Sequence, residues 1–182
     1  LVLSPSGREV RVRGIQIRGL TAETAQAGDR CALSLGGLEQ RDAARGDWVL
    51  DPIAHAPTTR MDVRLKVLAS EGHALAHWTP VHLHSGTASV AARIATPGAR
   101  PVAPGSTVHA QLVLDRPLVA VNGDRYIVRD HAARRTMGGG VVLDPFPPKR
   151  KPGPDRERVL EAMEAGDPEA ALNAQLASSV PI

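Results

Sequence analysis

The sequence predicts a mainly β protein with two antiparallel β-barrels, followed by a proline-rich linker and short α-helices. Short segments that alternate apolar and polar residues fill the first two-thirds, and four of them follow a glycine turn. Such a rhythm of short strands is typical of antiparallel barrels. Five prolines then crowd residues 145–154, and beyond them helical spacing replaces the alternation.

The first group of predicted strands covers residues 9–17, 31–35 and 48–50. Gly14 interrupts the first of these, which predicts a β-bulge. In the second, Cys31 lies on the same side as two leucines, so we expect a buried thiol.

The second group of predicted strands covers residues 81–84, 107–114, 125–129 and 141–143. Gly138–Gly140 precedes the last of them. No lysine or helix follows this glycine run, so we expect a tight hairpin rather than a phosphate-binding loop.

Two helices are predicted after the linker. Val159, Leu160 and Met163 form an apolar stripe at helical spacing, and Gly166 is expected to end that helix. Asp167 is followed by proline, as is typical of an N-cap residue before the first helical position, so a second helix is expected there.

Composition limits the classes of function. The net charge of +3 and pI near 9.6 permit an anionic partner. Four aromatic residues are too few for a series of base-stacking platforms, so an RNA partner would be held mainly through phosphates. Cys31 is the one cysteine, which excludes an internal disulfide and fits a reducing cytosol. No apolar run approaches the roughly 18 residues of a membrane span.

Motifs for catalysis are absent, including the phosphate loop, the nucleophile elbow and the zinc-protease helix. His77, His82 and His84 lie close together in the sequence and could hold a metal. The spacing H-x-H is weak evidence, so a polar or RNA-facing strand surface is the favoured interpretation and no metal site is predicted.

Several cations are candidate ligands for an anion. Arg30 lies opposite the apolar side of its predicted strand and could bind a carboxylate, a phosphate or a selenolate. A solvated surface arginine is the alternative. Further cations could lie along an RNA backbone or could simply be solvated, and these are Arg129, Arg134, Arg135, Lys149, Arg150 and Lys151.

Several strings resemble the second and third domains of translational GTPases, and in detail the bacterial selenocysteine-specific elongation factors. The similar segments are residues 21–33 with A-G-D-R, 45–50, 77–84, 104–105, 114–118, 124–130, 138–140 and the basic proline-rich linker. The resemblance covers essentially the whole chain.

The resemblance implies a role in bringing selenocysteinyl-tRNA to the ribosome in the cytoplasm, for recoding at UGA. Arg30 matches the arginine that lines the family's selenocysteinyl pocket. Contacts with tRNA are expected from Arg129, Arg134, Arg135, His82 and His84. The family binds GTP and Mg²⁺ through an N-terminal domain and a messenger RNA hairpin through C-terminal winged-helix domains. No cofactor is expected in this chain.

On this basis we expect residues 1–56 to be part of the second barrel, 57–144 the third-domain barrel, 145–154 the linker, and 155–182 the first helices of a winged-helix arm. The first barrel would be incomplete, and the chain would be a non-enzymatic piece of a longer protein. Two alternatives stay open: another tRNA-delivering GTPase, and a structural or interaction barrel without an RNA role.

Overall fold

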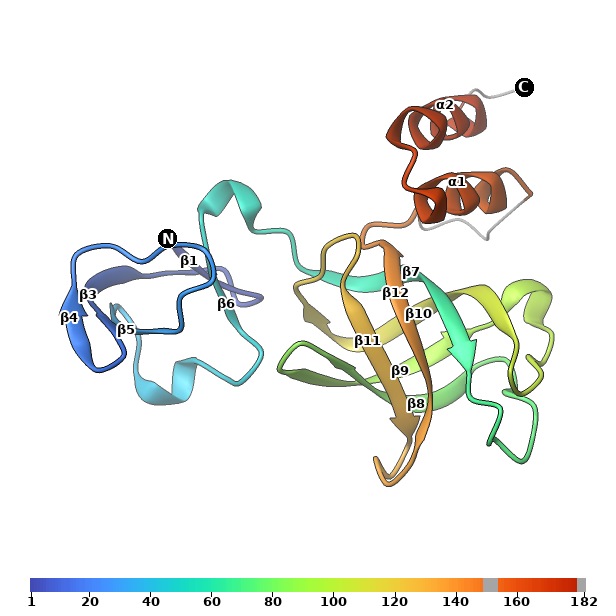
Figure 1. Cartoon of the computed structure of the whole chain (residues 1–182), viewed down its shortest axis with the longest axis horizontal. Helices are drawn as coiled ribbons and strands as arrows, with labels where there is room; N and C mark the ends of the chain where they lie inside the picture. Colours follow the sequence, from blue (N-terminus) through green and yellow to red (C-terminus); the bar gives the residue numbers. More distant parts are fainter. Residues whose placement is uncertain (149–153, 180–182) are drawn as a thin grey trace. The chain divides into compact units, whose positions relative to one another are not determined.

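The computed structural model describes residues 1–148 and 154–179, and it divides the chain into two units (Figure 1). The first unit is Leu1–Pro57 and the second is Thr58–Ile182.

The first unit holds two small antiparallel sheets. One has the strand order β2–β1–β6 and the other β4–β3–β5. The predicted bulge is confirmed, because the register of β3 shifts between Val12 and Gly14. The strands are β1 (Val2–Ser4), β2 (Arg8–Glu9), β3 (Arg11–Ile17), β4 (Leu20–Ala22), β5 (Cys31–Gly36) and β6 (Trp48–Leu50), with single turns of 3₁₀-helix at Gln40–Asp42 and Pro52–Ala54.

Neither of these sheets closes, so only one of the two expected barrels is present in the described residues. The first unit buries few apolar side chains, chiefly Val2, Leu3 and Val10. The prediction of a buried Cys31 is wrong, since its side chain is exposed and Leu33 on the same side is 38% exposed. Alternation identified the apolar side of β5, but this unit covers that side only in part, since Leu35 is half-buried while Cys31 and Leu33 are exposed.

The second unit contains a closed six-stranded antiparallel barrel with the strand order β10–β7–β12–β11–β8–β9. All four strands predicted for this part of the chain are confirmed, and two further strands, β7 and β9, complete the barrel. The barrel strands are β7 (Thr58–Val67), β8 (Thr79–Ser85), β9 (Ala88–Ala95), β10 (Thr107–Leu118), β11 (Arg125–Asp130) and β12 (Thr136–Asp144), and a 3₁₀ turn covers Pro97–Ala99.

Alternate residues of each strand fill the barrel, as the two-residue period requires. The odd-numbered residues of β7, from Met61 to Val67, are at most 1% exposed, while its even-numbered neighbours are mostly polar. Val81 and Leu83 do the same on β8. The histidines of β8 therefore point outward.

The glycine run Gly138–Gly140 lies inside β12, so the expected hairpin is wrong. Here the neighbouring strands come so close that a side chain would collide with their backbone. A Cβ on Gly138 would lie 2.6 Å from the Lys66 carbonyl oxygen, and one on Gly140 would overlap the carbonyl oxygen of Arg64. The glycines thus permit a close strand approach in place of a turn.

Two helices follow, α1 (Pro154–Ala165) and α2 (Pro168–Ser179), which confirms both predicted helices. Gly166 adopts φ +71° after α1, a conformation that glycine takes without strain. Asp167 caps α2 as expected, its carboxylate accepting the Ala170 N–H at 2.9 Å. Prolines occupy residues 145, 147 and 148, while the rest of the expected linker before Pro154 lies outside the described residues.

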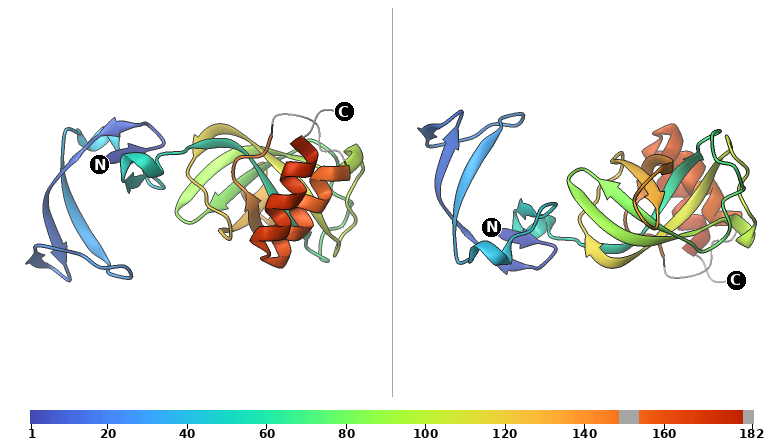
Figure 2. Two further views of the ribbon diagram at one scale, coloured as in Figure 1. Left: turned by 90° about the horizontal axis from the view of Figure 1, so that it is seen from above. Right: turned by 90° about the horizontal axis from the view of Figure 1, so that it is seen from below.

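A buried ionic cluster fixes α1 to the barrel, and the two helices lie side by side there (Figure 2). Arg156 is 8% exposed and donates to Asp62 of β7 at 2.8 Å and to Asp144 of β12 at 2.5 Å. At the edge of this contact, His109 of β10 bonds Glu157 and Glu164 of α1, each at 2.7 Å.

Candidate nucleic-acid interface

The outer face of the barrel carries three basic side chains from adjacent strands, which we call the basic stripe: His82 of β8, Arg93 of β9 and Arg129 of β11. His82 and Arg129 are directly paired in the ladder. Arg93 pairs with Pro80, two residues from His82, and so is its diagonal neighbour. Diagonal neighbours on one face are about 7–8 Å apart, within reach of long side chains. The stripe thus spans three strands.

The loop after β11 continues the stripe and is held in shape by Asp130. Its carboxylate accepts the backbone N–H groups of Arg134 at 2.6 Å and Arg135 at 3.1 Å. The hydrogen bond from the Arg135 N–H is the largest cause that lowers the pKa of Asp130. Burial opposes it, and the Arg134 N–H and the charges of Arg135 and Arg129 lower this pKa further. Arg129 donates to the Arg134 carbonyl at 3.0 Å. These hydrogen bonds therefore hold the backbone that carries Arg134 and Arg135 in one conformation.

The two arginines of this loop differ in their freedom. The Arg135 guanidinium is engaged by the Glu71 carboxylate, and this hydrogen bond raises the pKa of Arg135. The side chain of Arg134 is exposed and makes no hydrogen bond or ion pair to any described residue. The positive charge of Arg134 is therefore available to a phosphate, whereas the charge of Arg135 is already neutralised by Glu71.

His84 lies next to the stripe on the same outward face, two residues along β8 from His82. Burial lowers the pKa of His84, and the charges of Arg129 and His82 lower it further, so the ring is neutral at pH 7. His84 Nε2 and Arg129 Nε are both buried without a hydrogen-bond partner among the described residues. The ring of His82 lies 6.1 Å from that of His131, so the stripe and the loop meet at these two imidazoles.

The remaining sequence-predicted residues lie elsewhere. Arg30 precedes β5 in the first unit, is exposed, and makes no ion pair or hydrogen bond within residues 1–148 and 154–179. The predicted linker cations Lys149, Arg150 and Lys151 lie outside the described residues. Sequence reasoning missed Arg93, because the strand that carries it was not recognised.

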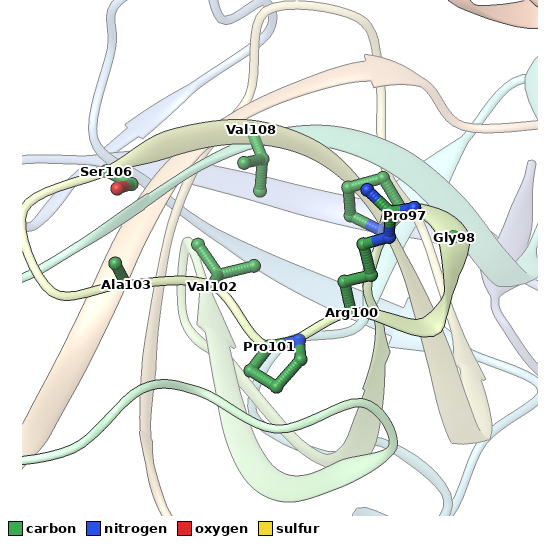
Figure 3. A pocket seen from close by; sticks show the side chains of 8 residues that line it. All are labelled: Pro97, Gly98, Arg100, Pro101, Val102, Ala103, Ser106 and Val108. Carbon is green, nitrogen blue, oxygen red and sulfur yellow. The ribbon is translucent and has the colours of Figure 1, made fainter.

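One hollow lies at the end of the barrel where β10 begins, with a volume of about 510 Å³ (Figure 3). Its walls are mostly apolar, and Arg100 is their one charged side chain. The lining residues are Pro97, Gly98, Arg100, Pro101, Val102, Ala103, Ser106 and Val108. This hollow contains none of the sequence-predicted site residues.

The part of the chain that the structure describes offers neither a metal site nor a membrane-spanning helix. No group of three or more His, Cys, Asp or Glu side chains there could hold a metal ion, His77 and the β8 histidines included. None of the described helices has the length and apolar character that crossing a membrane requires.

Comparisons with known proteins agree on one family. Residues 62–149 match the family model for the β-barrel domain of selenocysteine-specific elongation factor. The chain is similar to the selenocysteine-specific elongation factors of Desulfomicrobium baculatum (37% identical over 94% of the chain), Escherichia coli K12 (34% over 82%) and Haemophilus influenzae Rd (30% over 80%). It spans 27%, 23% and 23% of these relatives, about a quarter of their length. The chain therefore belongs to the family of selenocysteine-specific elongation factors.

Proposed function

We propose that this chain is a non-catalytic, RNA-facing part of a translation factor that brings selenocysteinyl-tRNA to the ribosome for incorporation at recoded UGA codons. The observation that carries the proposal is the basic stripe with its adjoining loop. Basic side chains from three strands and one loop face outward together, on a barrel that matches the family model of selenocysteine-specific elongation factor.

Phosphate contacts are the chemistry that this surface supports. The guanidinium groups of Arg93, Arg129 and Arg134 can each donate to phosphate oxygens, and none is neutralised by a carboxylate among the described residues. Such contacts position an RNA backbone without reading its sequence. We infer that the stripe aligns the tRNA, while selection of the amino acid occurs elsewhere.

Arg30 is the proposed selector. A selenol is ionised at neutral pH and a serine hydroxyl is not, so a fixed guanidinium favours selenocysteine over serine. A charge-assisted hydrogen bond contributes about 1.5–3 kcal/mol. The exposed, unpaired state of Arg30 leaves it available to such a ligand.

The other parts of the proposal concern the longer protein. The first unit would be the remainder of a second-domain barrel whose other strands lie outside this sequence, and the two helices would begin a winged-helix arm that binds a messenger RNA hairpin. GTP and Mg²⁺ would be bound by another domain, because this sequence has no phosphate loop. The site of action would be the cytoplasm.

Salt dependence of tRNA binding tests the proposal. The logarithm of the binding constant should fall linearly with the logarithm of salt concentration, and Arg129→Ala should reduce the slope by about one contact. Arg158→Ala is the matched control, since Arg158 is a highly exposed arginine of α1 outside the stripe. Absence of tRNA binding by the wild-type chain, or equal slopes for all three proteins, would contradict the proposal.

Discrimination by Arg30 needs its own measurement in the full-length factor. Arg30→Ala should weaken binding of selenocysteinyl-tRNA and leave seryl-tRNA unchanged. Equal losses for both aminoacyl forms would point to a different tRNA-delivering GTPase. No loss for either would remove Arg30 from the site.

A further inference from the structure

Trp78 holds a backbone conformation that bulky residues rarely adopt. Its φ is +69°, in the left-handed region that glycine occupies freely. The surrounding hydrogen bonds enforce this conformation: the Trp78 N–H donates to the Ile94 carbonyl at 2.7 Å, and the Trp78 carbonyl accepts from Arg93 at 3.4 Å. The ring is nevertheless 43% exposed, so its burial does not account for its presence.

His77 supports one side of the Trp78 ring. The two rings are stacked, with centroids 5.6 Å apart and an interplanar angle of 27°. The imidazole is itself fixed, because its Nδ1 accepts the backbone N–H of the buried Thr96 at 3.1 Å. Since Nδ1 accepts a hydrogen bond, the proton of the neutral ring lies on Nε2. The indole is therefore an exposed, preorganised flat surface.

This aromatic pair stands at the start of the basic stripe. Trp78 comes directly before β8, the strand that carries His82. Arg93, whose guanidinium bonds the Trp78 carbonyl, belongs to the stripe as defined above. A ligand lying along the stripe would thus place a negatively charged backbone on the cations and a planar group on the indole.

We propose that Trp78, supported by His77, is a stacking platform for one unpaired nucleobase of the RNA held by the basic stripe. The proposal rests on the RNA-binding function inferred above and adds a requirement for a single-stranded nucleotide. Indole presents the largest π-face among side chains, and stacking accepts any base. Backbone strain at a residue that glycine could replace is a recognised mark of functional placement.

The test compares Trp78→Leu with Trp48→Leu in the complete chain. Trp48 is 44% exposed and lies in the first unit, so it is matched to Trp78 in residue type and exposure. The probes are a short single-stranded RNA and a blunt RNA duplex of the same length. We expect Trp78→Leu to weaken the single strand about tenfold and to leave the duplex unchanged. The salt slope should stay constant, because stacking releases no counterions.

Fluorescence gives an independent readout. The chain has two tryptophans, so in Trp48→Leu all indole emission comes from Trp78. A stacked base should quench this emission on addition of the single strand and not of the duplex. Trp78→Phe should retain part of the affinity, and Trp78→Gly, which relieves the strained φ, should lose affinity without losing thermal stability.

The outcomes separate this inference from the function on which it rests. Binding of neither RNA by the wild-type chain would overturn both. If wild type and Trp78→Leu bind the single strand with the same affinity as each other, and likewise the duplex, the platform alone would be overturned. An equal loss for single strand and duplex would also overturn it, since Trp78 would then act through the shape of the stripe. A third result would overturn the platform in favour of a protein contact. In that case RNA would leave Trp78 emission unquenched, and the emission would shift only when the other domains of the full-length factor are added.

Discussion

Replacing Arg156 with alanine should detach α1 from the barrel while the barrel itself stays folded. The substitution removes the cation that neutralises Asp62 and Asp144, which are 3% and 8% exposed. These two carboxylates would then share a buried site without a counter-charge. Undocking of the helix is the available relief, because it returns both carboxylates to water.

The structure sets the size of the effect. Loss of one partner from a buried ion pair costs about 3–5 kcal/mol. The apolar side chains that α1 buries, chiefly Val159 and Leu160, contribute about 1.5–3 kcal/mol each. The cost of the unpaired carboxylates is comparable to the stabilisation from the buried apolar side chains, so the helix of the mutant loses most of its docking free energy. The barrel core from Met61 to Val67 contains no residue of α1 and should keep its stability.

Amide hydrogen exchange resolved by residue measures this directly. In Arg156→Ala, protection should fall across α1 and α2 and persist in β7 and β12. Arg158→Ala is the control on the same helix, because the Arg158–Asp155 pair at 3.6 Å is exposed and should contribute about 1 kcal/mol at most. Unchanged protection of α1 in Arg156→Ala, or equal losses in both variants, would refute the assignment of the buried cluster as the attachment of the helix.

Three further predictions follow from single contacts. Gly140→Ala should destabilise the barrel by about 3 kcal/mol in urea unfolding, since its Cβ would overlap the Arg64 carbonyl, whereas Gly72→Ala, with nothing near its Cβ, should be close to neutral. Burial raises the pKa of Tyr126, so unfolding should become easier above about pH 10, where only the unfolded chain loses the phenolic proton, and Tyr126→Phe should reduce this loss of thermal stability. Asp167→Ala should lower the helicity of α2 measured by circular dichroism, at a cost of about 1 kcal/mol.

Much of the β structure could be predicted because it begins at glycine turns. The expected turns at Gly28, Gly46, Gly105 and Gly123 all have positive φ, and each comes just before a strand. At these points the local backbone conformation decides where a turn forms, so the local sequence is enough to predict the turn and the strand that follows it. The bulge at Gly14 and the N-cap at Asp167 were predictable for the same reason.

Elements that depend on long-range contacts were missed or misread. β7 and β9 alternate as clearly as the predicted strands, and that alternation could have identified them. β9 also follows a glycine turn, at Gly86 with φ +54°, which was a second signal for this strand. Gly138–Gly140 resembled a turn, while its actual role depends on carbonyl groups of Lys66 and Arg64 more than 70 residues away. The exposure of Cys31 likewise depends on what covers a sheet, which no local pattern encodes.

The candidate site was predictable in composition and not in arrangement. His82 and Arg129 were singled out separately, but their direct pairing follows from the β8–β11 register. The engagement of Arg135 by Glu71 joins residues 64 positions apart. Trp78 was visible as one of few aromatics, yet its value as a platform depends on its φ and on the stacked ring of His77.

The order of the strands also determines how the barrel would respond to mechanical force. The chain enters through β7 and leaves through β12, which are antiparallel neighbours, so entry and exit lie at the same end. Tension between them would open the β7–β12 ladder like a zipper, one hydrogen bond after another, starting at the Asp62–Asp144 pair. Arg156 bonds both of these carboxylates and so links β7 to β12 at the end of the ladder where separation would begin. A barrel without free edges would therefore open first between β7 and β12, and α1, through Arg156, resists this separation.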